Sequence, residues 1–172
     1  YADTTRANFS RTMVISVFSF TEVARKAAAM MTAGGSLLTL TYGGSTRVMP
    51  NYNVMGVAKA ALESSVRYLA ADFGSDGIRV NAISAGPVRT LAGSGVTDAR
   101  LMFNFQKKNA PLKRTVTIDE VGRSALYLLS DLSSGVTGEV HFVDSGYSIM
   151  SMPRIEELKE QDRRESAETP AG

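Results

Sequence analysis

The chain has 172 residues, of which 44% are hydrophobic and 21% charged, and this composition is typical of one packed globular domain. Basic and acidic residues number 19 and 17, which leaves a net charge of +2, and the basic residues do not cluster, so we expect no nucleic-acid partner. Cysteine is absent and histidine occurs once, as His141, which excludes disulfides, thiolate chemistry and a metal site.

The first half of the chain predicts two long helices on either side of a short strand. Apolar residues at spacings of three and four predict an amphipathic helix over 9–31. The nearly continuous apolar run 36–41 predicts a strand buried on both faces. Asn51 is placed to cap a second long helix over 52–73.

The second half predicts two more strands and two shorter helices. A strand is expected over 78–83, and a short helix around 101–105. The run 117–120, Thr-Ile-Asp-Glu, is a capping box that begins another helix. A final strand is expected over 139–143. The tail 153–172 is highly charged with little apolar content, and we expect it to be solvated and frayed.

Strands that alternate with helices of this length predict parallel crossovers, and therefore an α/β fold with helices on both faces of the sheet. Residues 1–152 form this single domain, and 153–172 form the polar tail. Three strands are few for a doubly wound fold, and the chain contains no G-x-G-x-x-G and no P-loop pattern. The chain begins at Tyr1, within about ten residues of a helical pattern, and is interpreted as part of a longer protein. No apolar run approaches a membrane span and no secretory signal is recognisable, so no membrane partner is expected.

Tyr52 and Lys59 are the strongest candidates for chemistry. Seven helical steps of about 100° return to within roughly 20° of the start, so both side chains would project from one face of the predicted helix. An ammonium about 5 Å from a phenol, at an effective dielectric constant of about 20, favours the phenolate by roughly 3 kcal/mol and would lower the phenol pKa towards neutrality. Lys59 would keep donors for vicinal hydroxyls such as those of a ribose. The alternative is a half-exposed tyrosine and a surface lysine on an ordinary amphipathic helix.

The segment 42–59, which contains Pro-Asn-Tyr-Asn-Val-Met-Gly-Val-Ala-Lys at 50–59, closely resembles the enoyl-acyl-carrier-protein reductases of bacterial fatty-acid synthesis. These enzymes are a branch of the short-chain dehydrogenase/reductases. The stretches 79–90, 114–117, 130–135 and 138–140 extend the resemblance to about residues 4–150. Most short-chain dehydrogenases place the lysine four residues after the tyrosine. Here Gly56 stands at that place and Lys59 follows at seven, as in the enoyl reductases.

The resemblance implies that the chain is the C-terminal portion of a doubly wound parallel-sheet (Rossmann) domain, whose N-terminal nucleotide-binding half has no counterpart here. The three expected strands would be the fifth, sixth and seventh of that fold. The strand 36–41 would then have an open edge where the fourth strand pairs, and exposed edges favour aggregation.

The resemblance also implies roles for individual residues. Tyr52 matches the tyrosine that bonds the thioester oxygen, Lys59 the lysine that holds the nicotinamide ribose, and Tyr42 a second tyrosine of the substrate pocket. Met55 and Met102 match positions that line the acyl pocket. The expected cofactor contacts are Lys59, Val88, Arg89, Thr90, Leu91 and Ala92.

The implied activity is the NADH-dependent reduction of trans-2-enoyl-acyl-carrier-protein thioesters in the cytoplasm, by a homotetramer assembled through the helices 9–31 and 52–73. The preference for NADH follows from the resemblance alone. One alternative is a catalytically silent subunit that keeps only the assembly surface. Another is a different short-chain reductase, such as a ketoacyl reductase, against which the seven-residue spacing of Tyr52 and Lys59 argues.

Overall fold

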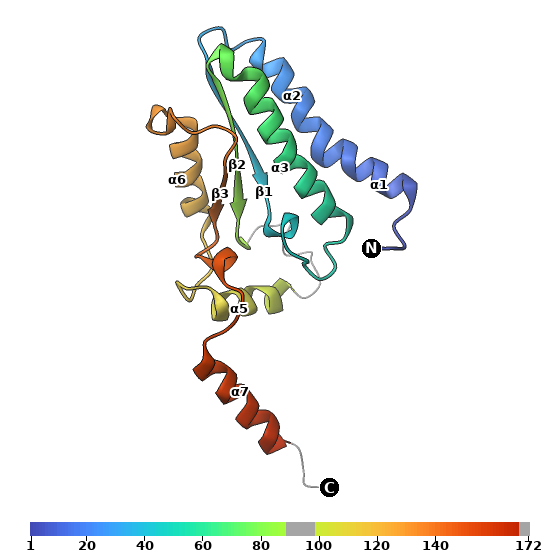
Figure 1. Cartoon of the computed structure of the whole chain (residues 1–172), viewed down its shortest axis with the longest axis vertical. Coiled ribbons are helices and arrows are strands. Elements are labelled where there is room, and N and C mark those ends of the chain that lie inside the picture. The colour runs from blue at the N-terminus through green and yellow to red at the C-terminus, as the bar shows by residue number, and fades with distance from the viewer. Residues whose placement is uncertain (89–98, 169–172) are drawn as a thin grey trace.

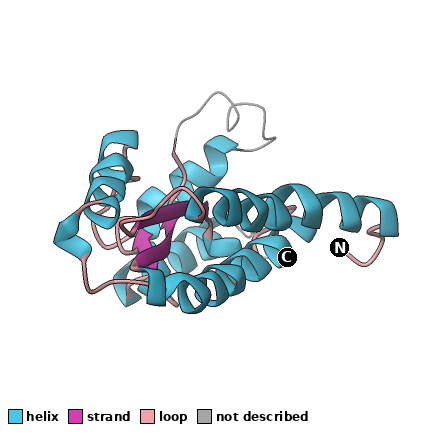
Figure 2. Ribbon diagram, turned by 90° about the horizontal axis from the view of Figure 1, so that it is seen from above, coloured by secondary structure: helices cyan, strands magenta, loops and turns pink. Residues whose placement is uncertain are grey.

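The computed structural model describes residues 1–88 and 99–168 and contains a parallel three-stranded sheet in the order β1-β2-β3. The strands are β1 (Gly35–Thr41), β2 (Ile78–Ala85) and β3 (Val140–Val143). The long helix α3 (Val54–Phe73) connects β1 to β2 and covers one face of the sheet, while α6 (Ile118–Leu129) packs on the other (Figures 1 and 2). The predicted α/β architecture with parallel crossovers is confirmed.

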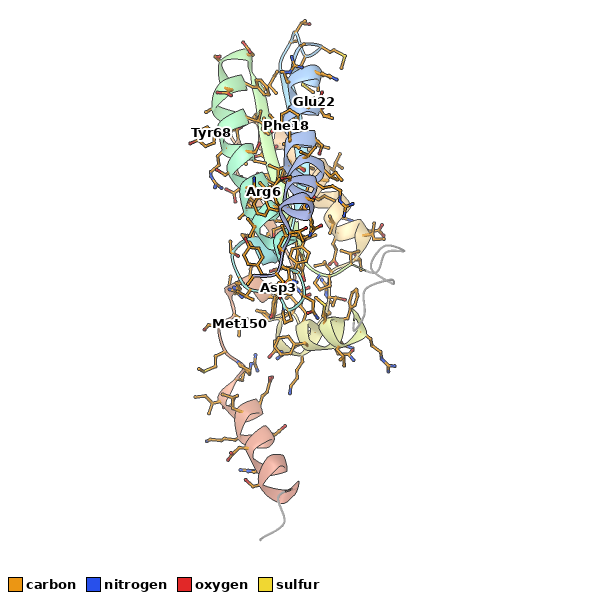
Figure 3. The ribbon with its side chains drawn as sticks, turned by 90° about the vertical axis from the view of Figure 1, so that its right-hand side faces the viewer. Asp3, Arg6, Phe18, Glu22, Tyr68 and Met150 are labelled. Carbon is orange, nitrogen blue, oxygen red and sulfur yellow. The ribbon has the colours of Figure 1, made fainter. Side chains whose placement is uncertain are left out.

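The N-terminal helix is continuous but contains one turn of π-helix. Its parts are α1 (Arg6–Met13), the π segment η1 (Val14–Phe18) and α2 (Ser19–Ala28). It therefore begins and ends about three residues earlier than the predicted 9–31. The helix runs beside α3 (Figure 3), and the hydroxyls of Thr21 and Ser65 lie 2.9 Å apart between the two.

The start of α3 differs from the prediction. Asn51 does not cap the helix, which begins at Val54 after a turn in which Asn51 and Asn53 have φ values of 63° and 44°. Asparagine tolerates positive φ better than most residues, and two such residues here turn the chain before the helix starts. Tyr52 consequently lies in this turn and not on the helix.

The core lies between the sheet and α3, where Ala24, Val66, Leu69, Ala70, Val80 and Ala82 are buried together. The central strand β2 is buried along most of its length, whereas β1 is half-covered and Leu40 is 54% exposed. The prediction that this first strand is buried on both faces is therefore wrong. Among the described residues β1 pairs with β2 alone, which agrees with the expected open edge.

The turns that precede β1 and β2 are in direct contact. Gly34 has a φ of 79°, and a Cβ there would lie 2.7 Å from the carbonyl oxygen of Gly77, whose own φ is 70°. Both positions therefore require glycine, for the backbone angle and, at Gly34, for the close approach as well.

The C-terminal part carries the predicted capping box, in which Thr117 and Glu120 bond each other's backbone N–H at the start of α6. Before it, α5 (Ala99–Asn109) crosses the end of the sheet, and α7 (Ile155–Glu168) extends away from the body of the molecule (Figure 1). The prediction of a frayed tail is wrong for 155–168, which are helical. An ion pair between Lys113 and Glu157, 2.9 Å long, ties the first turn of α7 to the domain.

Short 3-10 turns join the remaining elements: η2 (Gly43–Ser45), η3 (Gly74–Asp76), η4 (Asp131–Ser133) and η5 (Tyr147–Ile149). Within residues 1–88 and 99–168, no helix combines the length and the apolar character needed to cross a membrane.

Candidate active site

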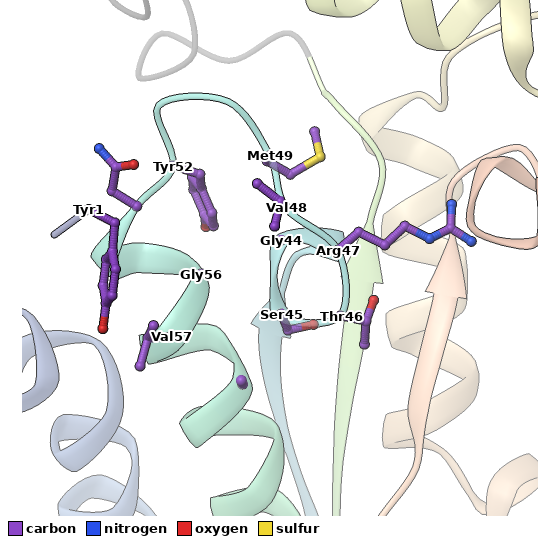
Figure 4. A pocket seen from close by; sticks show the side chains of 12 residues that line it. Tyr1, Gly44, Ser45, Thr46, Arg47, Val48, Met49, Tyr52, Gly56 and Val57 are labelled. Atoms are coloured by element: carbon purple, nitrogen blue, oxygen red, sulfur yellow. The ribbon is translucent and has the colours of Figure 1, made fainter. Parts of the chain in front are cut away.

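The loop after β1 and the first turn of α3 are packed so closely that two positions admit only glycine. A Cβ on Gly44 would lie 2.5 Å from the ring of Tyr52, and a Cβ on Gly56 would lie 2.8 Å from the carbonyl oxygen of Gly44. Figure 4 shows Tyr52 between this loop and the start of the helix. The glycine four residues after the tyrosine thus has a physical reason, because any side chain there would push the loop away.

Tyr52 and Tyr42 form the centre of the site. Tyr42 directly follows β1, and its ring meets that of Tyr52 edge to face with the centroids 5.1 Å apart. Burial raises the pKa of Tyr52 to about 12, with a smaller contribution from the negative charge that Tyr42 can carry. Burial likewise raises the pKa of Tyr42, and Tyr147 adds to it.

The expected lowering of the Tyr52 pKa is therefore wrong, because burial and a neighbouring phenol govern this group. Near neutral pH, Tyr52 keeps its proton and is a hydrogen-bond donor.

Lys59 is anchored to the first strand. Its ammonium donates a hydrogen bond of 2.9 Å to the carbonyl oxygen of Leu40, and burial lowers its pKa against the opposing effect of Glu63. Because Tyr52 precedes the helix, the predicted arrangement of the pair on one helix face is wrong. Both residues nevertheless border the C-terminal end of β1, where Lys59 contacts Leu40 and Tyr52 contacts Tyr42.

Glu63 is a residue of this site that the sequence reasoning missed. It is 7% exposed, lies one helical turn beyond Lys59, and accepts a 2.6 Å hydrogen bond from the hydroxyl of Thr41. The spacing of four residues between Lys59 and Glu63 could have predicted that the two side chains are neighbours on the helix. The buried carboxylate holds the end of β1 against α3 and places a negative charge beside the lysine.

Two cavities adjoin the tyrosine pair and share the loop residues 46–49. The smaller, about 480 Å³, is lined by Tyr52 and the start of α3. The larger, about 710 Å³, is lined by Tyr42, the end of β2, α5 and the turn after β3, and Met102 lies in its wall. Tyr42 and Met102 therefore line the larger cavity, and Tyr52 lines the smaller one.

The other predicted site residues are not all brought to these cavities. Met55 lines neither, because it lies on the side of α3 that faces η1, where its sulfur accepts a long contact of 3.7 Å from the Ser16 hydroxyl. Val88 directly follows Pro87, which lines the larger cavity. The remaining predicted cofactor contacts, Arg89, Thr90, Leu91 and Ala92, lie outside the described residues.

The turn after β3 is held together by Asp144, which lies within it, and is tied to the loop before α3 by Arg47. The carboxylate of Asp144 accepts hydrogen bonds from the backbone N–H of Gly146 (2.9 Å) and Ser148 (2.7 Å). The guanidinium of Arg47, which points away from Tyr52 in Figure 4, donates to the carbonyl oxygens of Tyr147 (3.4 Å) and Met150 (3.0 Å). The Arg47 contacts join segments about 100 residues apart and left no signal in the sequence.

Gln106, from α5, is a second residue that the sequence did not reveal. It is 4% exposed and forms part of the wall of the larger cavity. Its Nε2 lies 3.5 Å from the carbonyl oxygen of Asp144, while its Oε1 has no hydrogen-bond partner among the described residues. A buried acceptor of this kind is costly unless something binds to it.

Comparison with known proteins agrees with this geometry. Residues 1–148 match the family model described as Enoyl-(Acyl carrier protein) reductase. The chain belongs to the enoyl-(acyl carrier protein) reductase family. Enoyl-acyl-carrier-protein reductase (NADH) 2 of Rhizobium meliloti strain 1021 is 75% identical over 162 residues, which are 94% of this chain and 60% of that protein. The corresponding protein of Rickettsia typhi, FabI, is 54% identical over 90% of this chain and 59% of its own length.

Solved structures of the family have the same fold. FabI from Candidatus Liberibacter asiaticus matches with a TM-score of 0.86 and 60% identity, over 90% of this chain and 60% of that one. The reductase from Anaplasma phagocytophilum, solved in complex with NAD, matches with a TM-score of 0.86 and 57% identity, over 90% of this chain and 59% of that one. The chain thus spans about 60% of the length of these relatives, which is consistent with the C-terminal portion of a Rossmann domain.

Proposed function

We propose that this chain carries the substrate side of an NADH-dependent enoyl-acyl-carrier-protein reductase, which reduces the trans-2 double bond of an acyl thioester. The observation that supports this most directly is the pair of tyrosines, whose ring centroids are 5.1 Å apart, beside two cavities of about 480 and 710 Å³ that share the loop residues 46–49. Cavities of this size suit a small-molecule substrate. The resemblance also implies a cytoplasmic location and a homotetramer, and both belong to the proposal.

Lys59 and Gln106 would hold the nicotinamide end of the cofactor, although only Gln106 lines one of the two cavities. Lys59 uses one N–H on Leu40 and has two more donors for ribose hydroxyls, and the unpartnered Oε1 of Gln106 offers an acceptor in the same wall as Gly86 and Pro87. Val88, Arg89, Thr90, Leu91 and Ala92 remain proposed contacts of the cofactor. When bound, NADH supplies the hydride.

Tyr52 acts on the oxygen of the substrate. Hydride addition at the β-carbon of an enoyl thioester moves negative charge onto the carbonyl oxygen, and a fixed phenol donor stabilises that charge. A pKa of about 12 keeps the donor proton on Tyr52 throughout the physiological range. Tyr42 packs against the ring of Tyr52 and limits its movement, so the phenol is held ready before the substrate arrives.

The test is NADH oxidation with a crotonyl thioester, measured on the complete protein that carries this chain. Tyr52→Phe removes the donor without removing the ring, and we expect kcat/KM to fall by about a hundredfold. Lys59→Met should raise the KM for NADH. Unchanged turnover in both variants would exclude the roles assigned to these two residues.

The exposed apolar face of the N-terminal helix favours a second candidate, a catalytically silent assembly subunit. Val14, Ile15, Phe18 and Val23 are each more than half exposed. A stable oligomer in size-exclusion chromatography, with no nucleotide binding in calorimetry, would favour this candidate over the enzyme.

A ketoacyl reductase is the weaker alternative, because its lysine would stand at position 56. A Cβ there already approaches the carbonyl oxygen of Gly44 to 2.8 Å, which leaves no room for a long side chain. Turnover of an acetoacetyl thioester in preference to a crotonyl thioester would favour the ketoacyl reductase over the enoyl reductase.

A further inference from the structure

One wall of the larger cavity is formed by an aromatic pair that has no assigned role. The ring of Tyr147, from η5, meets the ring of Phe105, from α5, nearly at right angles with the centroids 6.4 Å apart. Both line the cavity together with Met102. The pair therefore bridges two segments of the chain at the boundary of the space into which Tyr42 faces.

Tyr147 and Tyr42 both line this cavity. Its negative charge, when present, raises the pKa of Tyr42, so the two phenols are within electrostatic reach of each other. The residue thus extends from the neighbourhood of the tyrosine pair to the apolar wall made by Phe105.

The position of Tyr147 is fixed by contacts on its own backbone. Its carbonyl oxygen accepts a hydrogen bond from Arg47, and its N–H donates to the carbonyl oxygen of Asp144 at 3.2 Å. The Asp144 carboxylate holds the N–H groups of the neighbouring Gly146 and Ser148. A wall residue anchored in this way has little freedom to move aside for a larger ligand.

We propose that Tyr147 is a specificity-determining residue that limits the length of the acyl chain the cavity accepts. The inference rests on the proposed function. Tyr42, whose ring packs against that of Tyr52, lines the larger cavity, and the inference places the acyl chain in this cavity, whose walls include Met49, Met102 and Phe142. The ring of Tyr147 then bounds the volume that the chain can fill, and each methylene excluded costs binding energy.

The experiment compares short and long acyl chains in turnover and in binding, with the complete protein. Turnover is measured with crotonyl and dodecenoyl thioesters, and binding by calorimetry with butyryl- and dodecanoyl-pantetheine. Tyr147→Ala should raise the ratio of long-chain to short-chain kcat/KM at least about tenfold, mainly through KM, because the ring does not touch the reacting atoms. The ratio of the two binding constants should shift in the same direction.

Three variants serve as controls. Tyr147→Phe keeps the ring and should keep the chain-length ratio, whereas Tyr147→Leu, a smaller change than alanine, should give an intermediate ratio. Tyr127→Ala removes the ring of a similar pair, Tyr127 and His141 at 6.4 Å, that lines neither cavity, and it should leave the ratio unchanged.

The outcomes separate this inference from the proposed function. An active wild type whose chain-length ratio is the same in Tyr147→Ala and Tyr147→Leu overturns the role of Tyr147 and leaves the reductase intact. A wild type that binds the acyl-pantetheines but does not reduce the crotonyl and dodecenoyl thioesters, with the ratio of binding constants shifted in the variants, supports Tyr147 and overturns the reductase. Absence of both turnover and binding in the wild type overturns both.

Discussion

Tyr52 shows how the surroundings of one side chain decide its chemistry. The sequence predicts a lysine-activated phenol, whereas the structure has a phenol whose proton is held more tightly because burial penalises the phenolate. Such a group is suited to donate a hydrogen bond and unsuited to act as a base. The spacing of Tyr52 and Lys59 pointed to the right residues but not to the protonation state, because burial depends on tertiary packing.

The raised pKa of Tyr52 predicts the pH dependence of stability. Between pH 10 and about 12 the unfolded chain loses the phenol proton while the folded chain keeps it, so this group makes folding less favourable as pH rises through that range. Below pH 10 it has no effect. We expect the phenolate absorbance of wild type minus that of Tyr52→Phe to titrate near pH 12. A difference titrating near pH 10 would contradict the burial argument.

Ser145 carries two local penalties that a single substitution removes. Its φ is 60°, a conformation that favours glycine, and its buried hydroxyl has no partner among the described groups. Ser145→Gly should raise the free energy of unfolding by about 1 kcal/mol, measured by urea denaturation. Ser134→Gly, at a φ of −55°, is the matched control and should lower it. A destabilised Ser145→Gly would show that the hydroxyl has an unrecognised role.

At the scale of elements, the predictions succeeded where the determinants are local. The capping box of Thr117 and Glu120 depends on four consecutive residues only, and α6 begins there as predicted. The start of α3 could not be predicted because it depends on the positive φ of Asn51 and Asn53, which the neighbouring loop imposes. The helix α7 was missed because none of its described side chains is buried, so no apolar face marks it in the sequence.

Two helical glycines give a direct test of the packing between α3 and the loop after β1. Alanine at an open position in a helix stabilises it by about 1 kcal/mol relative to glycine. Gly122 in α6 is such a position, because a Cβ there would meet no neighbouring described atom within 4 Å, whereas at Gly56 the carbonyl oxygen of Gly44 would lie 2.8 Å away. We expect Gly122→Ala to raise the melting temperature and Gly56→Ala to lower it. Equal shifts of the melting temperature in the two variants would mean that the loop moves away from the new Cβ without loss of stability.

At the scale of the whole molecule, the parallel direction of the strands was predictable because helical crossovers require parallel neighbours, whereas their order was predicted from the resemblance. The contacts that assemble the site were not. Arg47 bonds the backbone of residues 147 and 150, and Gln106 bonds that of residue 144. The local sequence around Arg47 and Gln106 does not predict these partners. Tyr42, Tyr52 and Met102 could be assigned to one site only through the resemblance.

The open edge of β1 should govern how this chain behaves when it is purified by itself. Among the described residues the outer edge of β1 pairs with no other strand, and an edge of this kind beside the exposed Leu40 favours edge-to-edge association. A charge at this edge opposes pairing, so Leu40→Lys should lower the average mass measured by light scattering at high concentration. Leu132→Lys changes a residue that is 80% exposed on η4, away from the sheet, and should leave the mass unchanged. Equal masses for wild type and Leu40→Lys would indicate association through another surface.

The contact between Gly34 and Gly77 sets the register in which β1 and β2 pair. Gly35 pairs with Ile78 and Thr41 with Ser84, so the ladder runs without a break from this common origin. One extra residue inserted after Gly34 would rotate every later side chain of the first strand to the opposite face. The Thr41 hydroxyl would then point away from Glu63, and their hydrogen bond would be lost. An insertion at the start of the strand would therefore alter the surroundings of Lys59 at its other end.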